Sequence, residues 1–90
     1  MTSELILLHQ LLTYINENET IVVENGVYCP ENPLIHALLF LAEDCLTGPE
    51  GYKHIHELKK QGWNIYPGDQ DRFGWLTGCI ELKRGIIVFG

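Results

Sequence analysis

The first half of this sequence has no positive charge. Residues 1–44 contain no lysine or arginine, whereas their acidic residues are Glu4, Glu17, Glu19, Glu24, Glu31, Glu43 and Asp44. All six basic residues lie in residues 45–90 beside five acidic ones, so the halves carry −7 and +1. This asymmetry predicts one surface that repels a polyanion and one that tolerates it. The alternative is an acidic protein whose charge only keeps it in solution.

Cysteine is scarce and follows no known framework. Cys29, Cys45 and Cys79 are an odd number, lie far apart and form no CxxC motif, which excludes the disulfide pattern of small secreted domains. The start, Met1–Glu4, lacks the positive region of a signal peptide. The longest nearly apolar run, Leu34–Ala42, has about half the residues that a membrane span needs. We therefore expect a soluble, cytoplasmic protein with reduced thiols.

Motifs that fix a chemistry are also missing. The sequence contains no phosphate loop, nucleophile elbow or dinucleotide fingerprint. His54 and His56 lie two residues apart, and on a helix their side chains would point about 160° from each other, so they could not grip one metal ion. His36 and Glu43, two turns apart, indicate an interior histidine rather than an acid–base pair. Asp69–Asp71 is typical of a solvated turn. We expect no enzyme, no metal and no cofactor.

The composition that remains is that of an ordinary globular protein. The chain has 90 residues, of which 46% are apolar and 20% are charged, and its mean hydropathy is −0.01. These values exclude a disordered tail, a collagen-like repeat and a coiled-coil rod. A chain of this length holds at most one domain, so we assign residues 1–90 to a single domain.

The N-terminal third predicts a helix followed by a hairpin. Apolar residues at helical spacing cover one half of an amphipathic helix from Ser3 to about Asn18, with Ser3 as its cap. Two short apolar runs, residues 20–24 and 27–29, then flank Asn25-Gly26. This dipeptide favours a type I′ turn, so we expect a two-stranded hairpin.

Two further helices are predicted in the middle of the chain. Asn32-Pro33 is a strong helix start, and the segment Leu34–Leu46 is apolar almost all round. We therefore expect it to be the buried centre of the domain, with Leu38 and Leu41 almost fully buried. A third helix, from about Pro49 to Gln61, would bury Tyr52, Ile55 and Leu58.

The C-terminal third predicts strands. The segment Trp63–Tyr66 is typical of a strand, and the turn-rich residues 67–71 follow it as a loop. Two more strands are expected at about Gly74–Leu82 and Ile86–Phe89, with Gly85 at positive φ between them. The predicted class is α+β: three helices, an N-terminal β-hairpin and a C-terminal antiparallel sheet.

The third helix carries a compact cationic arc made by Lys53, His56 and Lys60. The segments 42–47 and 52–65, within residues 34–82, resemble the helix–turn–helix and first wing strand of winged-helix DNA-binding domains. The resemblance implies a winged-helix-like fold and a transcription-regulatory protein that places this helix in the major groove of double-stranded DNA. Lys53, His56 and Lys60 would then face DNA, supported by Arg72 and, further along the chain, by Lys83 and Arg84.

Other functions stay open beside DNA binding. A net charge of −6 is unusual for a DNA binder, since phosphate neutralisation supplies most of the affinity. The alternative is a protein-interaction module, an inhibitor or an assembly subunit, that uses the acidic N-terminal half or an exposed sheet edge. An unrecognised small enzyme or ligand binder is a third hypothesis. We also expect a homodimer, because the apolar strand Ile86–Phe89 has few charges to guard its edge.

Overall fold

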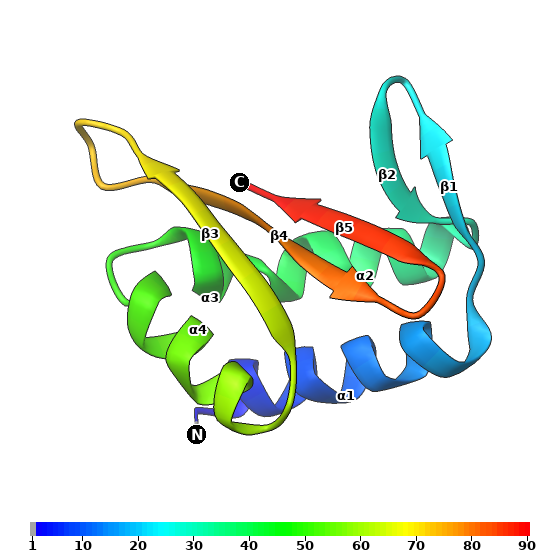
Figure 1. Ribbon diagram of the computed structural model, residues 1–90, viewed down its shortest axis with the longest axis horizontal. Helices are drawn as coiled ribbons and strands as arrows, with labels where there is room; N and C mark the ends of the chain where they lie inside the picture. Colours follow the sequence, from blue (N-terminus) through cyan, green and yellow to red (C-terminus); the bar gives the residue numbers. More distant parts are fainter. Residues whose placement is uncertain (1) are drawn as a thin grey trace.

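The computed structural model describes residues 2–90 and confirms the α+β class (Figure 1). Within these residues, three helices of ten or more residues and one single-turn helix accompany five strands. The elements in chain order are α1 (Ser3–Asn18), β1 (Ile21–Glu24), β2 (Val27–Pro30), α2 (Pro33–Ala42), α3 (Asp44–Thr47), α4 (Gly51–Lys60), β3 (Asn64–Gln70), β4 (Leu76–Leu82) and β5 (Gly85–Phe89). No helix in this part of the chain combines the length and apolar character that crossing a membrane requires.

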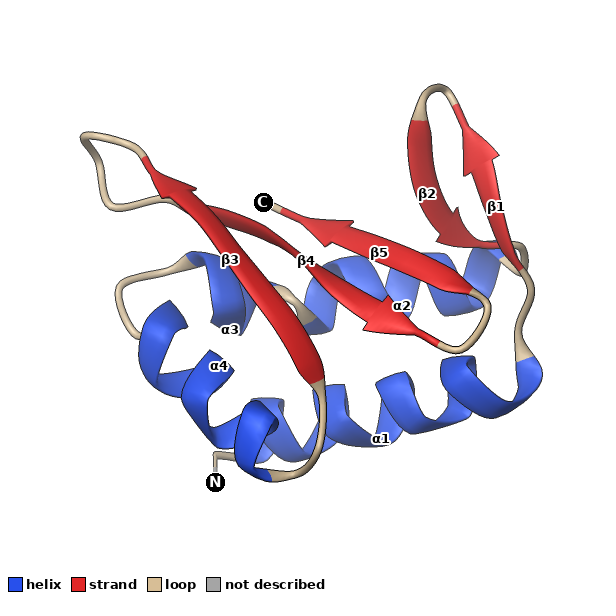
Figure 2. Ribbon diagram, in the orientation of Figure 1, coloured by secondary structure: helices blue, strands red, loops and turns tan. Residues whose placement is uncertain are grey.

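The strands form two separate antiparallel units. The C-terminal sheet has the order β3-β4-β5, and the N-terminal strands β1 and β2 pair only with each other. Figure 2 shows the hairpin standing beside one end of β5, while the helices lie along one face of the larger sheet. The core therefore sits between the helical layer and the β3-β4-β5 sheet.

The core is built mainly from α1 and the sheet. The predicted amphipathic character of α1 is confirmed, with a narrower buried face than expected. Leu7 and Tyr14 of the predicted apolar half are 50% and 47% exposed, and the buried residues are Leu5, Leu8, Leu11, Leu12 and Ile15. They join buried side chains of the sheet, which are Ile65, Leu76, Ile80, Leu82, Ile87 and Phe89. The cap differs from expectation by one residue: the Thr2 hydroxyl accepts a hydrogen bond of 3.2 Å from the Leu5 amide. Thr2 rather than Ser3 therefore caps the helix, whose first residue is Ser3.

The predicted hairpin is confirmed in detail. Asn25 and Gly26 have φ values of 53° and 78°, the two positive angles that a type I′ turn requires. The strands that flank this turn pair in register, with Glu24 opposite Val27 and Ile21 opposite Pro30.

The predicted helix Leu34–Leu46 is wrong in extent and in burial. It ends at Ala42, and α3 follows as a separate turn after Glu43. Leu38 and Leu41, expected to be almost fully buried, are 41% and 71% exposed. The buried residues of α2 are Leu39 and Ala42. A helix that is apolar all round does not indicate which face packs, and in this small domain only one side of α2 meets other elements.

The boundaries of the later elements also differ. Tyr52, expected to be buried by α4, is 51% exposed, whereas Ile55 and Leu58 are buried as expected. Strand β3 continues to Gln70 through the segment that was expected to be a loop, with an irregular register after Pro67. Proline and glycine signal turns by local preference, but pairing with β4 keeps this segment extended. Gly85 has the expected positive φ, 154°.

Candidate functional site

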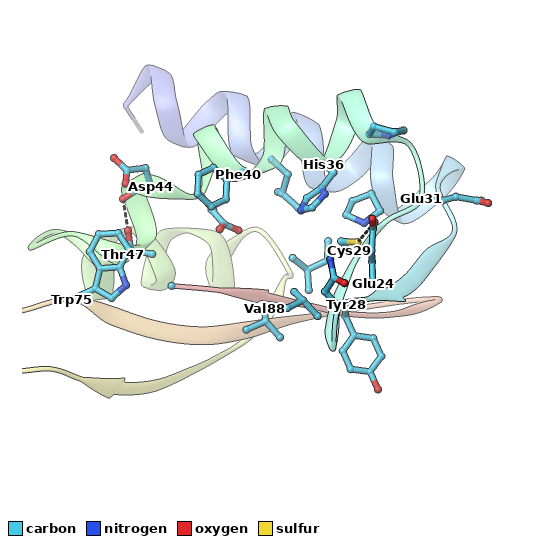
Figure 3. Close-up of a pocket in the computed structure, with 18 residues that line it drawn as sticks. Glu24, Tyr28, Cys29, Glu31, His36, Phe40, Asp44, Thr47, Trp75 and Val88 are labelled. Atoms are coloured by element: carbon cyan, nitrogen blue, oxygen red, sulfur yellow. Dashed lines mark hydrogen bonds between the residues drawn. The ribbon is translucent and has the colours of Figure 1, made fainter.

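A groove of about 560 Å³ separates the hairpin and α2 from strand β5. Figure 3 views it from the side, with α2 along one wall and the sheet along the other, and with Glu31 and Trp75 toward its opposite ends. Its lining comes from the hairpin, α2, α3 and the C-terminal sheet, and consists of Glu24, Asn25, Val27, Tyr28, Cys29, Pro30, Glu31, Pro33, His36, Leu39, Phe40, Glu43, Asp44, Thr47, Trp75, Ile87, Val88 and Gly90. Residues far apart in the sequence therefore meet at one elongated depression.

The walls of the groove expose large apolar side chains. Phe40 of α2 is 68% exposed, and Trp75 of the β3–β4 loop and Val88 of β5 are each 44% exposed. Leu39 and Ile87 form the buried base of the walls. Exposed aromatic residues gathered around a concave surface are typical of binding sites, because they lose water when a partner covers them.

The charges in the groove all have one sign. Four carboxylates line it, from Glu24, Glu31, Glu43 and Asp44, and no lysine or arginine of residues 2–90 does so. The sequence asymmetry therefore has a structural counterpart: the acidic half of the chain supplies the groove. Such a surface attracts a cationic partner and repels phosphate groups.

Glu43 is the most perturbed of these carboxyl groups. Burial, followed by the negative charge of neighbouring Asp44, raises the pKa of Glu43 from 4.5 to about 7. Cys29 also lies in the groove, with its Sγ 3.9 Å from a Glu24 carboxylate oxygen. Burial and the charge of Glu24 raise the pKa of the Cys29 thiol, so this thiol is protonated at neutral pH and is a weak nucleophile.

The two outer strands of the sheet differ in the features that prevent an edge strand from pairing with a strand of another molecule. Strand β3 carries Pro67, Asp69 and a register irregularity, features that discourage pairing with another strand. Strand β5 reads Gly-Ile-Ile-Val-Phe and has none of them. In the described chain, no backbone hydrogen bond joins the outer edge of β5 to another element. The unguarded edge runs along the groove at Ile87, Val88 and Gly90.

The predicted DNA-binding residues of α4 lie on the surface, outside the groove. Lys53, His56 and Lys60 are exposed on one helix. Each lysine has a carboxylate nearby: Lys53 Nζ is 3.8 Å from Glu50 and Lys60 Nζ is 3.7 Å from Glu57. The predicted cationic arc is therefore exposed, but carboxylates partly neutralise it.

The other basic candidates make contacts of their own. Arg72 lies in the β3–β4 loop, with its guanidinium 4.9 Å from the centre of the Phe73 ring. Lys83 binds the Glu17 carboxylate at 2.8 Å and donates its backbone N–H to Asn16. Lys83 therefore joins the β4–β5 turn to α1, and its hydrogen bond, followed by its charge, lowers the pKa of Glu17.

Two of the histidines, His54 and His9, and the thiol of Cys45 lie at packing contacts. The Nδ1 of His54 donates to the Cys45 carbonyl oxygen at 2.6 Å, which holds α4 against α3. His9 accepts a 2.8 Å hydrogen bond from the Trp63 indole. Burial raises the pKa of Cys45 to about 11. Within residues 2–90, no group of three or more histidine, cysteine, aspartate or glutamate residues has the arrangement that would hold a metal ion.

Sequence reasoning did not find the groove, although two signals pointed toward it. The absence of charge over Leu34–Ala42 predicts burial, but it also fits a helix with a surplus apolar face. The apolar strand after Gly85 predicts an edge that can pair with another strand. The missing information was tertiary: nothing in the sequence places the hairpin opposite this strand.

Comparison with known proteins assigns this chain to no family. No protein-family model matches the chain, no curated protein matches it, and no solved structure matches it.

Proposed function

We propose that this protein is an interaction module that binds a basic, apolar segment of another protein in the groove between the hairpin, α2 and β5. The observation that carries the proposal is the lining of the groove, which combines exposed apolar side chains with four carboxylates and no cation. Apolar burial favours binding by roughly 25 cal/mol per Å², from which the entropy lost on association is subtracted. The uniform charge selects partners that carry lysine or arginine.

The shape of the site favours a polypeptide over a compact ligand. The groove extends from Glu31 beside the hairpin to Trp75 beyond the opposite end of α2 (Figure 3). Its volume lies within the range of small-molecule pockets, about 300–1,000 Å³, but its open side exposes Phe40 by 68%. An extended chain can cover such an open, elongated site along its length.

A displayed library of random peptides tests this proposal. We expect wild-type protein to enrich peptides that Phe40→Asp protein does not retain. Phe40 and Leu41 are adjacent on α2 and similarly exposed, at 68% and 71%, but only Phe40 lines the groove. Leu41→Asp is therefore the matched control and should retain the same peptides. No enrichment, or equal loss in both variants, would overturn the proposal.

DNA binding by a winged-helix-like domain is the second proposal. It is supported by the exposure of Lys53, His56 and Lys60 on one helix. Against it stand Glu50 and Glu57, each within 4 Å of one of these lysines. The net charge of −6 also repels duplex DNA, and screening at about 0.15 M salt limits any local attraction to roughly 8 Å. For these reasons we rank peptide binding in the groove above DNA binding by α4.

A homodimer paired through β5 is a separate proposal about assembly. Its support is the unguarded edge described above. Such pairing would bring two sets of groove carboxylates together, so we expect added salt to strengthen it. Light scattering at micromolar concentration tests it, with Val88→Lys as the disrupting variant because Val88 is 44% exposed. A mass of 10.3 kDa at both low and high salt would exclude the dimer.

A further inference from the structure

We infer that the occupant of the groove is an extended strand, which adds to the sheet beside β5 and presents lysine or arginine to Glu43. This inference rests on the proposed function and specifies its partner. It combines two independent features of one site: the free backbone edge of Ile87–Gly90 and the acidic, apolar lining opposite that edge.

The backbone of β5 supplies the first half of the recognition. An edge strand presents a row of unpaired N–H and C=O groups, and an added strand satisfies them without regard to its own side chains. The hairpin covers the beginning of β5, where the Ile21 side chain lies against Gly85. Strand β2 also lies near β5 without a backbone hydrogen bond to it, and the part of β5 that borders the groove is Ile87–Gly90. At about 3.3 Å per residue, it accepts a segment of roughly four residues.

The side chains of the groove supply the second half. Successive residues of a strand point to opposite faces of the sheet. Ile87 and Phe89 point into the core, whereas Val88 is exposed between them. One set of alternate residues in the added strand therefore lies on the core side, the side of Leu39 and Glu43. The other set lies beside Val88 on the outer face.

Charge decides which strand fits. Glu43 and Asp44 are neighbours at the end of α2, and Glu24 and Glu31 lie at the hairpin end of the same groove. The lining has three other titratable residues, which are His36, Tyr28 and Cys29. It contains no lysine or arginine of residues 2–90 that would neutralise the carboxylates. A cationic side chain in the strand would therefore be the first positive charge in the groove. The β5 strand of a second copy reads Gly-Ile-Ile-Val-Phe, so it has no lysine or arginine within the strand to place opposite Glu43.

A short synthetic peptide tests the strand directly. The probe is N-acetyl Val-Lys-Val-Lys-Val amide, titrated at millimolar concentration into isotope-labelled protein and followed by backbone NMR shifts. We expect the largest shifts at Ile87–Gly90 and at Glu43. Two N-methylated forms of the probe separate a strand from other modes of binding: one is methylated at residues 2 and 4, the other at residues 1, 3 and 5.

The methylated forms should differ in affinity at least tenfold. In an added strand, alternate N–H groups face β5, so methylation of one set removes the hydrogen bonds while the other set faces away. Equal affinities, or no shift from the parent peptide, would overturn strand addition. The proposed function would survive that result if library peptides still bound wild-type and Leu41→Asp protein but not Phe40→Asp protein.

A separate set of variants tests how much charge contributes to binding of the probe peptide. Replacement of both lysines of the probe by glutamate should weaken binding at least tenfold, and Glu43→Gln should remove most of that preference. Glu50→Gln changes an exposed carboxylate of the same chain outside the groove, and it should leave the preference unchanged. An equal response to both variants would mean that net charge, not the groove, selects the peptide.

Discussion

Helices α2 and α4 have the same length, ten residues each, and opposite character. The polar α4 buries Ile55 and Leu58 and exposes ion pairs of lysine with glutamate. The apolar α2 carries no lysine, arginine, aspartate or glutamate, and yet Leu34, Phe40 and Leu41 are 67–71% exposed. The amphipathic helix has as many apolar residues as its packing needs, whereas α2 has more. Exposed apolar area beyond what the core requires indicates a surface that another molecule covers.

The largest expected effect separates the two sides of α2. Leu39 is 2% exposed, so Leu39→Ala should lower the free energy of unfolding by about 2–5 kcal/mol through lost burial and a residual cavity. Leu41→Ala removes the same atoms from a side chain that is 71% exposed and should cost less than about 1 kcal/mol. Urea denaturation measures both. Similar losses in the two variants would mean that α2 packs on both sides.

The next effect concerns the surface of α4. If Lys53 and Lys60 contact phosphates, then Lys53→Glu combined with Lys60→Glu should abolish binding to random duplex DNA without unfolding the domain. Each lost contact should flatten the slope of log K against log salt by about 0.9. Fluorescence anisotropy across a salt series measures both quantities. If wild-type protein does not bind duplex DNA even at about 20 mM salt, where screening is weak, the DNA-binding proposal is wrong.

The same contrast explains which parts of the structure could be predicted from the sequence. Helix α1 and the Asn25-Gly26 turn follow from periodicity and local preference, and both are confirmed. The buried face of α4 is confirmed at Ile55 and Leu58 but not at Tyr52. Helix α2 has no polar side to orient it, so its burial depended on tertiary packing. Strand β3 overrode the turn preference of Pro67-Gly68 by pairing with β4. The groove could not be predicted because it joins residues from Glu24 to Gly90.

A smaller effect is expected from the acidic groove beside α2. The pKa of Glu43 is about 7 in the folded chain against an ordinary 4.5. The folded state therefore keeps a proton that the unfolded chain loses, and stability falls as the pH rises from 4.5 to 7. Glu43→Gln removes this penalty. Because the group is partly exposed, we expect a gain of about 1 kcal/mol at pH 8 and none at pH 4.5.

Urea denaturation of wild-type and Glu43→Gln protein at the two pH values measures this difference. Glu31→Gln is the control, since Glu31 is an exposed carboxylate of the same groove and its substitution removes one carboxylate there while leaving Glu43 in place. If Glu43→Gln is no more stable than wild type at pH 8, Glu43 is well solvated, and burial in the groove does not destabilise its charged form.

The smallest effect should come from the ion pairs of α4. Lys53 and Glu50 are 76% and 63% exposed in their side chains and lie 3.8 Å apart. Water screens such pairs, and holding two long side chains in place costs entropy, so a coupling of about 0.5 kcal/mol or less is expected. A double-mutant cycle of Lys53→Met and Glu50→Gln measures it. A coupling near zero would mean that Lys53 is free to leave Glu50 for a phosphate at little cost. A coupling above about 1 kcal/mol would instead make the pair part of the fold, and would weaken the case for α4 as a binding surface relative to the groove beside α2.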